Sequence, residues 1–420
     1  MSPAVGSLVL ILVLAIAYAV DKIPAAVVAI TAAMVAALLH YIPYGNAFSG
    51  LAGSAAMLLM SMMVVGGGLF HTGLAAKIAR FFLRLTGTTE RGIMVAVMLV
   101  AALLSAVLNN VGVVVTLMPI VLKMCKDAHV SPSRGLMPLA YGAAVGGIIT
   151  LVGAASTVTA VGVLESSGVE SVGFFEVGAI GIPLSALSIL FIYVFGQKII
   201  PDYGFDFSGM ELYAEDKENT DPKKQMICAG VFAFTIISMA FKPFGMPLYF
   251  LSSLGALLLV LTGCISQKEA LESIDWPTII ICGAMIAVGT AVSKTGGSKL
   301  ISAWVVQTLG VGASPYFVTA LIVAVVTICT QFLSNVSTAT LMTPIAIAIA
   351  QGIGCNPKTL GIIVIISANA SFLTPVGAQA FTVIYGVGKY KFLDFFKVGL
   401  PMVIINTILA LVLVPMIWPF

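Results

Sequence analysis

The chain alternates long uncharged apolar stretches with short polar segments. A helix needs about 20 mainly apolar residues to cross the hydrocarbon core of a membrane, so stretches of this length predict transmembrane helices. The first stretch has no basic residues before it, which indicates a membrane helix and not a cleaved signal peptide. Ten stretches are expected to span the membrane: residues 6–20, 24–42, 53–72, 135–164, 176–197, 227–243, 246–264, 277–293, 360–386 and 396–417.

Two further apolar regions, residues 92–122 and 314–354, do not fit a single crossing. Four basic residues at positions 77–91 precede the first region and three at positions 123–134 follow it. A single crossing would place one of these clusters outside, against the positive-inside bias. A re-entrant helical hairpin returns both flanks to the cytoplasm, with its turn at 109–111. Backbone that turns at membrane depth must face protein or water, so the hairpin implies a cavity.

A short motif at this turn occurs twice. Residues 109–111 read Asn-Asn-Val and residues 334–336 read Ser-Asn-Val, and in both a proline stands nine residues after the central asparagine. Other matches keep nearly the same spacing: 72–73 with 295–296, 150–154 with 374–378, and 174–178 with 395–399. The matches predict a duplicated unit. Polar motifs inside duplicated apolar units are typical of transporters with a site between two repeats.

Residues 74–85 predict an interfacial helix that leads into the first hairpin, with its basic and apolar residues on opposite faces. The basic face holds Lys77, Arg80 and Arg84, and the apolar face holds Ile78, Phe81 and Leu85. The equivalent segment 298–309 is much less basic, which an external location would explain. With 74–91 in the cytoplasm, the number of spans places both termini outside and orients the two repeats in opposite directions.

The expected fold is therefore an all-α polytopic membrane protein with two inverted repeats, each with a re-entrant hairpin and a broken transmembrane helix. Its expected parts are N-terminal scaffold helices at 1–52, a first inverted repeat at 53–200 with its hairpin at 92–122, a polar cytoplasmic linker at 201–226, scaffold helices at 227–276, and a second inverted repeat at 277–420 with its hairpin at 314–354.

Broken helices are expected because two spans are too long and too rich in glycine. A continuous helix over 135–164 would extend about 45 Å, against about 30 Å of hydrocarbon. Unwound backbone is predicted near 153–157 and near 377–379, so two hairpin tips and two interrupted helices would meet at mid-membrane. Helix N-termini directed at this point favour an anion. Carbonyl, hydroxyl and amide oxygens there favour a hard cation such as sodium.

The charge pattern favours sodium over protons as the coupling ion. No Lys, Arg, Asp or Glu occurs within 92–122, 135–164, 300–357 or 359–388. A proton-coupled carrier usually needs an intramembrane carboxylate or histidine as a relay. Serine and threonine in such helices most often bond their own backbone, which is the simpler reading of Thr116, Thr338 and Thr340. Buried asparagines are costly unless partnered, so Asn110 and Asn335 are the principal candidates for binding.

The sequence resembles the divalent anion/sodium symporter family. These proteins are bacterial relatives of sodium–dicarboxylate and sodium–sulfate cotransporters within the ion transporter superfamily. The resemblance rests on the asparagine motif at two hairpin tips, on the Pro-Val-Gly-Ala-Gln run at 375–379, on residues 385–395 and on 269–276. It implies a homodimer in which a scaffold domain holds the interface and a transport domain moves like an elevator. No enzymatic activity is expected.

The resemblance also implies site residues by position. One sodium site would use Ser105, Asn109, Asn110 and carbonyl groups near Gly153; the other would use Thr330, Asn335 and carbonyl groups near Gly377. The substrate would lie between Asn110 and Asn335. Relatives carry threonine after each asparagine, whereas this chain has Val111 and Val336. Ser156, Thr157 and Gln379 could supply replacement donors, and sulfate or a less polar organic anion fits as well as a dicarboxylate.

Composition limits the remaining alternatives. With 60% hydrophobic and 9% charged residues and a mean hydropathy of +1.12, the chain is not a soluble globular domain. Its net charge of +3 does not suggest nucleic acid, and its six cysteines form no CxxC pair. The expected function is a sodium-coupled symporter of a small anion in the plasma (inner) membrane, in contact with lipid. An anion channel and an uncoupled or exchange carrier remain as alternatives.

Overall fold

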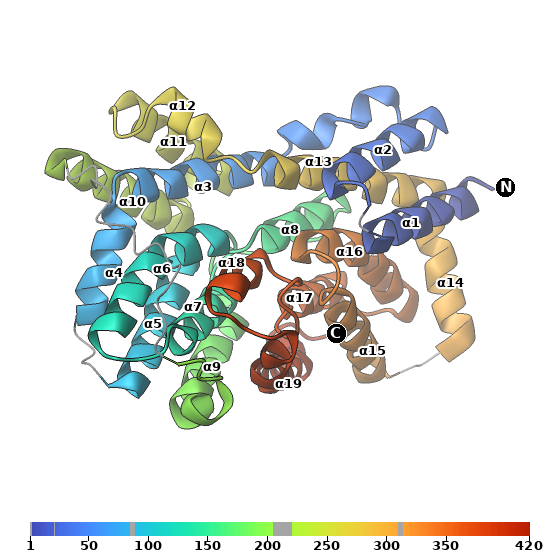
Figure 1. Ribbon diagram of the computed structural model, residues 1–420. Coiled ribbons are helices and arrows are strands. Elements are labelled where there is room, and N and C mark those ends of the chain that lie inside the picture. The colour runs from blue at the N-terminus through green and yellow to red at the C-terminus, as the bar shows by residue number, and fades with distance from the viewer. Residues whose placement is uncertain (1, 21, 85–88, 205–220, 310–313) are drawn as a thin grey trace.

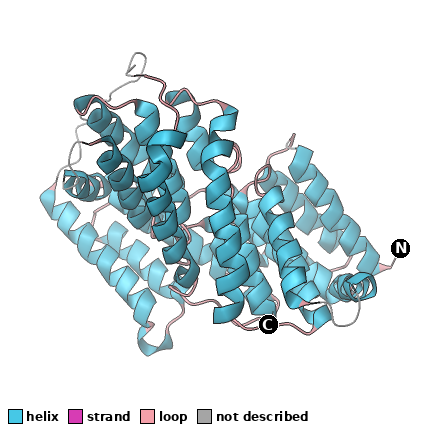
Figure 2. Ribbon diagram, turned by 90° about the horizontal axis from the view of Figure 1, so that it is seen from below, coloured by secondary structure: helices cyan, strands magenta, loops and turns pink. Residues whose placement is uncertain are grey.

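The computed structural model describes residues 2–20, 22–84, 89–204, 221–309 and 314–420, apart from the side chains of Arg84, Val305, Val306, Thr308 and Leu309. These residues form helices and loops only (Figure 2). The α-helices are α1 (Pro3–Val20), α2 (Ala25–Leu38), α3 (Ser54–His71), α4 (Leu74–Arg84), α5 (Glu90–Ser105), α6 (Asn110–Asp127), α7 (Pro132–Gly146), α8 (Ala155–Ser166), α9 (Gly178–Ile199), α10 (Pro222–Phe241), α11 (Leu248–Leu261), α12 (Gln267–Glu272), α13 (Trp276–Thr295), α14 (Gly297–Leu309), α15 (Pro315–Cys329), α16 (Asn335–Ile353), α17 (Pro357–Ala368), α18 (Gln379–Val387) and α19 (Phe392–Ile417).

Three short 3-10 turns complete the secondary structure of the described ranges: η1 (Tyr44–Asn46), η2 (Ser49–Ala52) and η3 (Pro243–Gly245). Among the described residues, seven helices are long and apolar enough to cross a membrane: α1, α3, α9, α10, α13, α16 and α19. Four shorter apolar helices accompany them: α2, α11, α15 and α17. The expectation of an all-α polytopic membrane protein is confirmed.

The helices form two layers (Figure 1). One layer contains α3 and α13 end to end, with α1 and α2 beside α13 and α10 to α12 beside α3. The other contains the hairpins α5–α6 and α15–α16 together with α7, α9, α17, α18 and α19, and α8 lies between the layers. Helices α4 and α14 stand at opposite ends of the molecule. They are the two segments predicted as interfacial, so their positions fit repeats of opposite orientation.

Each hairpin turns where an N-terminal cap starts its second helix. The first turn covers residues 106–109 and the second 330–334. The Asn109 side chain accepts a hydrogen bond of 2.9 Å from the Val111 N–H, and the Ser334 hydroxyl accepts one of 3.1 Å from the Ser337 N–H. Such caps satisfy N–H groups that have no partner within the helix. The helix α6 thus begins within the turn predicted at 109–111.

Both long spans are broken, as their length predicts. The first is interrupted at 147–154, between α7 and α8, and the second at 369–378, between α17 and α18. A Cβ atom at Gly153 would lie 2.6 Å from the carbonyl oxygen of Ser105, so only glycine allows the break to approach the hairpin this closely. The unwound stretch expected near 153–157 ends earlier: Ser156 and Thr157 lie in the first turn of α8, and Gln379 begins α18.

The polar linker expected at 201–226 is only partly described, because residues 205–220 lie outside the described residues. Leu85, predicted on the apolar face of the interfacial helix, lies outside them as well. The linker ends earlier than expected. The helix α10 begins at Pro222, because the Asp221 carboxylate accepts a hydrogen bond of 2.9 Å from the Lys223 N–H. Proline at the first helical position needs no such partner, so the two residues together start the helix.

Candidate functional site

The candidate site is built around the two asparagines at the hairpin tips. Asn110 is the first residue of α6 and is half-buried. One terminal atom of its amide lies 2.5 Å from the Ser105 hydroxyl, 3.2 Å from the Gly153 carbonyl oxygen and 3.3 Å from that of Ala143. All three neighbours are oxygens. The amide can satisfy them in two ways: its nitrogen donates to them, or its oxygen joins them around a cation.

Asn335 at the second tip has the same kind of surroundings. One terminal atom of its amide lies 3.0 Å from the Thr330 hydroxyl, 2.9 Å from the Ser371 hydroxyl and 3.2 Å from the carbonyl oxygens of both Ala368 and Gly377. The Thr330 hydroxyl also donates a hydrogen bond of 2.5 Å to the Ala368 carbonyl. We call these groups the Asn110 cluster and the Asn335 cluster. In both, a hairpin tip meets the break of the long helix beside it.

A threonine hydroxyl links each helix interruption to the adjacent hairpin by a hydrogen bond, and the two contacts are equivalent in the two repeats. The Thr150 hydroxyl donates to the carbonyl of Ala106, and the Thr374 hydroxyl donates to that of Gln331 over 2.7 Å. The threonines are 224 residues apart and their acceptors 225, the spacing of the repeated motif. The duplication inferred from short sequence matches therefore recurs at the level of single hydrogen bonds.

The second half adds side chains that the first half lacks. The Gln331 amide donates hydrogen bonds of 2.8 Å to the carbonyls of Thr327 and Ala370 and accepts one of 2.9 Å from the Leu373 N–H. The residue 225 positions earlier is Ala106. Gln331, Ser371 and Asn369 are not among the residues predicted from the sequence. A polar side chain inside an uncharged apolar run was the available signal, because such a group needs a partner at membrane depth.

The predicted site residues divide between the clusters and their surroundings. The structure brings Ser105, Asn110 and Gly153 together in one cluster, and Thr330, Asn335 and Gly377 in the other. Asn109 lies apart: its side chain is exposed and caps α6 through the Val111 N–H. The roles of all these residues as ligands remain predictions.

The residues predicted to contact substrate differ in exposure. Ser156 and Thr157 are buried, at 2% and 0% exposure, and their hydroxyls face the Asn369 amide. Val111 and Val336 are half-buried, and Val336 packs against a buried apolar cluster to which α1, α2 and α13 contribute. Gln379 is exposed at the start of α18. Of these predicted groups, only Gln379 offers an exposed polar side chain.

Among the threonines expected to bond their own backbone, Thr338 and Thr340 differ from each other. The Thr340 hydroxyl donates to the Val336 and Ser337 carbonyls, at 2.9 and 3.0 Å, within its own helix. The Thr338 hydroxyl is buried and has no hydrogen-bond partner among the residues that the structure describes. For Thr340 the local reading therefore holds.

Buried charge lies at the ends of the helices. The Lys358 ammonium, 9% exposed, lies 2.8 Å from the Glu176 carboxylate, which accepts a further hydrogen bond of 2.7 Å from the Trp418 indole N–H. Burial would raise the pKa of Glu176, but hydrogen bonds from the Gly173 N–H, Lys358 and Trp418 outweigh it, so its pKa lies below the usual value. This group joins the start of α17, the end of α19 and the loop before α9.

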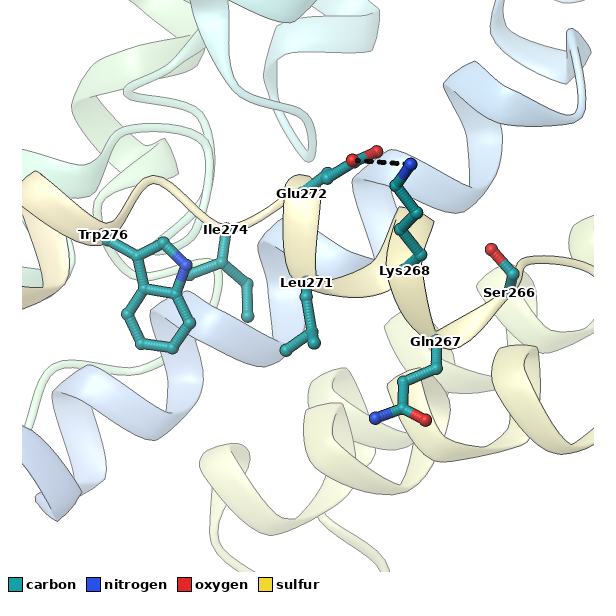
Figure 3. A pocket seen from close by; sticks show the side chains of 7 residues that line it. All are labelled: Ser266, Gln267, Lys268, Leu271, Glu272, Ile274 and Trp276. Carbon is teal, nitrogen blue, oxygen red and sulfur yellow. Dashed lines mark ion pairs between the residues drawn. The ribbon is translucent and has the colours of Figure 1, made fainter.

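A surface pocket of about 710 Å³ lies beside α12 and the start of α13 (Figure 3). Its lining residues are Ser266, Gln267, Lys268, Leu271, Glu272, Ile274 and Trp276. Lys268 and Glu272 face each other across 3.8 Å, and both side chains are exposed. No lining residue belongs to a hairpin or a broken helix, so this pocket is not the candidate site.

Comparison with known proteins agrees with this architecture. Residues 10–358 match the family described as "Citrate transporter". The chain is 31% identical over 217 residues to the transporter YfbS of Escherichia coli K12, a match that covers 52% of this chain and 35% of YfbS. It is 23% identical over 369 residues to the sodium-dependent dicarboxylate transporter SdcS of Staphylococcus saprophyticus, covering 78% of this chain and 69% of SdcS. The chain thus spans about a third of YfbS and about two thirds of SdcS.

Two solved structures share the fold. The antimetabolite efflux pump MtrF of Neisseria gonorrhoeae superposes with a TM-score of 0.65 at 15% identity, over 99% of this chain and 94% of MtrF. The YdaH transporter of Alcanivorax borkumensis does so with a TM-score of 0.62 at 13% identity, over 89% of this chain and 87% of YdaH. At these identities the likeness concerns the fold alone. The resemblance inferred from the hairpin motifs is confirmed, and the chain is an integral membrane protein that belongs to the citrate transporter family.

Proposed function

We propose that the chain is a sodium-coupled secondary transporter, a symporter, of a small anion such as a dicarboxylate, sulfate or a related oxyanion. The observation that carries the proposal is the pair of oxygen clusters at Asn110 and Asn335. Each combines an amide, a hydroxyl and backbone carbonyls from a hairpin tip and a broken helix. The name of SdcS, a sodium-dependent dicarboxylate transporter, supports the same substrate class.

Sodium is the cation that suits these clusters best. Their donors are all oxygens, which hard cations prefer over nitrogen and sulfur ligands. Their donors are also neutral, since the segments 92–122, 135–164, 300–357 and 359–388 contain no Asp, Glu, Lys or Arg. A proton would need a titratable relay group at this depth. Each cluster therefore offers a coordination shell for sodium as a transported ion and no acceptor for a transported proton.

An anion is favoured by the direction of the helices. The helices α6, α8, α16 and α18 all begin at a hairpin tip or at a break. Helix N-termini carry unpaired N–H groups and a partial positive charge, and bound sodium would add to that charge. Substrate would then lie between Asn110 and Asn335, bordered by Val111, Val336 and Gln379, with Ser156 and Thr157 behind it at the start of α8.

The two layers support an elevator movement. Small residues line the contact between α3 and α8: a Cβ atom at Gly162 would lie only 2.5 Å from the Ala55 Cβ. Gly289 of α13 faces Val163 and Pro344 at ordinary van der Waals distances, 3.8 and 3.9 Å from a Cβ built there. Small side chains at this interface would let the hairpin layer slide along α3 and α13. The predicted scaffold helices at 1–52 and 227–276, which pack beside α13 and α3, would hold the interface of a homodimer in the plasma (inner) membrane, with both termini outside.

Uptake into proteoliposomes tests the proposal. We expect saturable uptake of a dicarboxylate or sulfate that depends on an inward sodium gradient. Asn110→Ala and Asn335→Ala should each abolish it, because each removes an amide ligand, worth about 1–3 kcal/mol per lost bond, from one of the two clusters. Asn46→Ala, outside the hairpins, is the control and should retain uptake. Full uptake driven by a pH gradient in sodium-free buffer would refute the proposal.

A further inference from the structure

Asn369 joins the two broken helices through its side chain. It follows α17 directly and is 3% exposed. Its amide nitrogen donates a hydrogen bond of 2.8 Å to the Ile365 carbonyl and lies 3.4 Å from the Thr157 hydroxyl. Its amide oxygen accepts a hydrogen bond of 2.7 Å from the Ser156 hydroxyl. Because the nitrogen faces a carbonyl, the orientation of the amide is fixed, and the oxygen must face α8.

This bridge lies between the two oxygen clusters. Asn369 follows Ala368, whose carbonyl oxygen is 3.2 Å from the Asn335 amide. Ser156 stands three residues after Gly153, whose carbonyl oxygen is 3.2 Å from the Asn110 amide. The hydrogen bond from Ser156 to Asn369 therefore connects a backbone segment of one cluster with a backbone segment of the other through a few buried residues.

The bridge has no counterpart in the first half of the chain. The residues 225 and 224 positions before Asn369 are Ala144 and Val145, neither of which has a polar side chain. The threonine contacts that fasten the breaks to the hairpins occur in both halves, so they serve each cluster separately. The Asn369 contact occurs once and links one half to the other, which is what a connection between the clusters requires.

We propose that Asn369 is a positioning residue that couples sodium binding at the two clusters, an inference that rests on the proposed function. Sodium in the Asn335 cluster holds the Ala368 carbonyl and, with it, the adjacent Asn369. The Asn369 amide then holds Ser156 and the start of α8, which sets the position of the Gly153 carbonyl in the Asn110 cluster. A first bound ion therefore orders part of the second site in advance, and the coupling acts equally in both directions.

Sodium activation of uptake at a saturating concentration of anion tests the coupling. The wild-type protein should show a Hill coefficient above 1. Asn369→Ala should lower it to 1 and raise the half-saturating sodium concentration about fivefold or more, the usual range for such coupling. Ser156→Ala removes the same hydrogen bond from its other side and should have the same effect. The double variant should be no worse than Asn369→Ala, because that variant has already lost the hydrogen bond that Ser156→Ala removes.

Asn406→Ala is the matched control. Asn406 is also a buried asparagine, and its amide lies 3.4 Å from the Ile366 carbonyl in the same part of α17, but it has no hydrogen bond with α8. It should retain the wild-type Hill coefficient. The unfolding temperature of each purified variant, measured at increasing sodium concentrations, gives a second measurement that does not depend on transport. Asn369→Ala and Ser156→Ala should need more sodium than the wild-type protein for the same rise in unfolding temperature.

The outcomes separate the two proposals. Uptake by the wild-type protein that is independent of sodium would overturn the proposed function itself. Sodium-dependent uptake with an unchanged Hill coefficient in both Asn369→Ala and Ser156→Ala would overturn the coupling and leave the proposed function in place. If Asn369→Ala does not fold, Ser156→Ala alone decides, because it removes the hydroxyl of a helical residue and leaves the Asn369 bond to Ile365 intact.

Discussion

Asparagine is suited to both hairpin tips because its amide can either donate to oxygens or join them around a cation. Asn110 and Asn335 each face a hydroxyl and backbone carbonyls at distances of 2.5 to 3.3 Å. Alanine could not satisfy these oxygens, and aspartate would bring a charge that is costly at this depth. A neutral amide would therefore suit the tip both with and without the proposed cation.

Val111 and Val336 should limit the affinity for dicarboxylates. Both follow the tip asparagines and are half-buried, and neither can donate a hydrogen bond to a carboxylate. Val111→Thr combined with Val336→Thr should raise the apparent affinity for succinate about tenfold, since one hydrogen bond to a charged group contributes about 1.5–3 kcal/mol. Competition of succinate against the transported anion measures the change.

The control for this prediction is Val115→Thr, an exposed position of α6 one turn beyond the tip. It adds the same hydroxyl away from the proposed substrate position and should leave the affinity unchanged. Micromolar affinity of the wild-type protein for succinate would contradict the argument, because the valines would then impose no limit.

Single residues also show what the sequence could and could not predict. Ser105 and Thr330 stand five positions before the tip asparagines, and the family resemblance was enough to place them at the predicted sodium sites. The carbonyl groups of Ala143 and Ala368 carry no side-chain signal. The contact of Asn369 with Ser156 joins positions 213 residues apart and depends on how the two broken helices pack. No local pattern contains that information.

At the scale of the elements, the helix breaks could be predicted from the length of the apolar spans and from their glycine residues. A span of 30 uncharged residues is too long for one crossing, and Gly153 marks where the first break meets the hairpin. The limits of the breaks were less predictable. The helix α8 begins at Ala155, and its first turn contacts Asn369 through Ser156, a tertiary contact that no local pattern predicts. The helix α12, of six residues, was not expected because it is short and polar; a capping box of Ser266 and Glu269 starts it.

The joint formed by Glu176, Lys358 and Trp418 should weaken in acid. The pKa of Glu176 is lowered from its ordinary value of 4.5, so the ionised carboxylate stabilises the folded joint above that value. This stabilisation is lost as the pH falls below about 4.5 and through the lowered pKa. With Trp276 and Trp304 replaced by Phe, the emission of Trp418 should shift over this acidic range as its hydrogen bond to Glu176 opens.

Two variants test the origin of that shift. Glu176→Gln should remove the pH dependence, because the residue no longer titrates. Glu170→Gln is the matched control: its carboxylate also faces Lys358, at 3.5 Å, but is 82% exposed, so solvent screens the pair and the shift should persist. A shift that is unchanged in Glu176→Gln would show that another group is responsible.

For the whole molecule, contacts at the two ends agree with the predicted topology. Tyr203, after α9, donates a hydrogen bond of 2.6 Å to Asp394 at the start of α19, and both positions are predicted to be cytoplasmic. Trp418 and Glu176, both predicted to be external, meet at the opposite end of these helices. The separation of α4 from α14 in Figure 1 fits the same assignment. Which end faces the cytoplasm remains a prediction, made from the basic residues near α4.

Labelling from the two sides of the membrane tests the inverted repeats directly. Single cysteines at Arg91 and Lys123 mark the base of the first hairpin, and single cysteines at Ser314 and Gln351 mark the base of the second; all four residues are exposed. In a background in which the six native cysteines are replaced, a membrane-impermeant maleimide should reach the first pair only from the cytoplasmic side and the second pair only from outside. A hairpin returns to the side it entered, so each pair must behave alike.

Labelling of Arg91→Cys and Lys123→Cys from opposite sides would mean that α5 and α6 cross the membrane as one span. Labelling of all four positions from the same side would mean that the two repeats are not inverted.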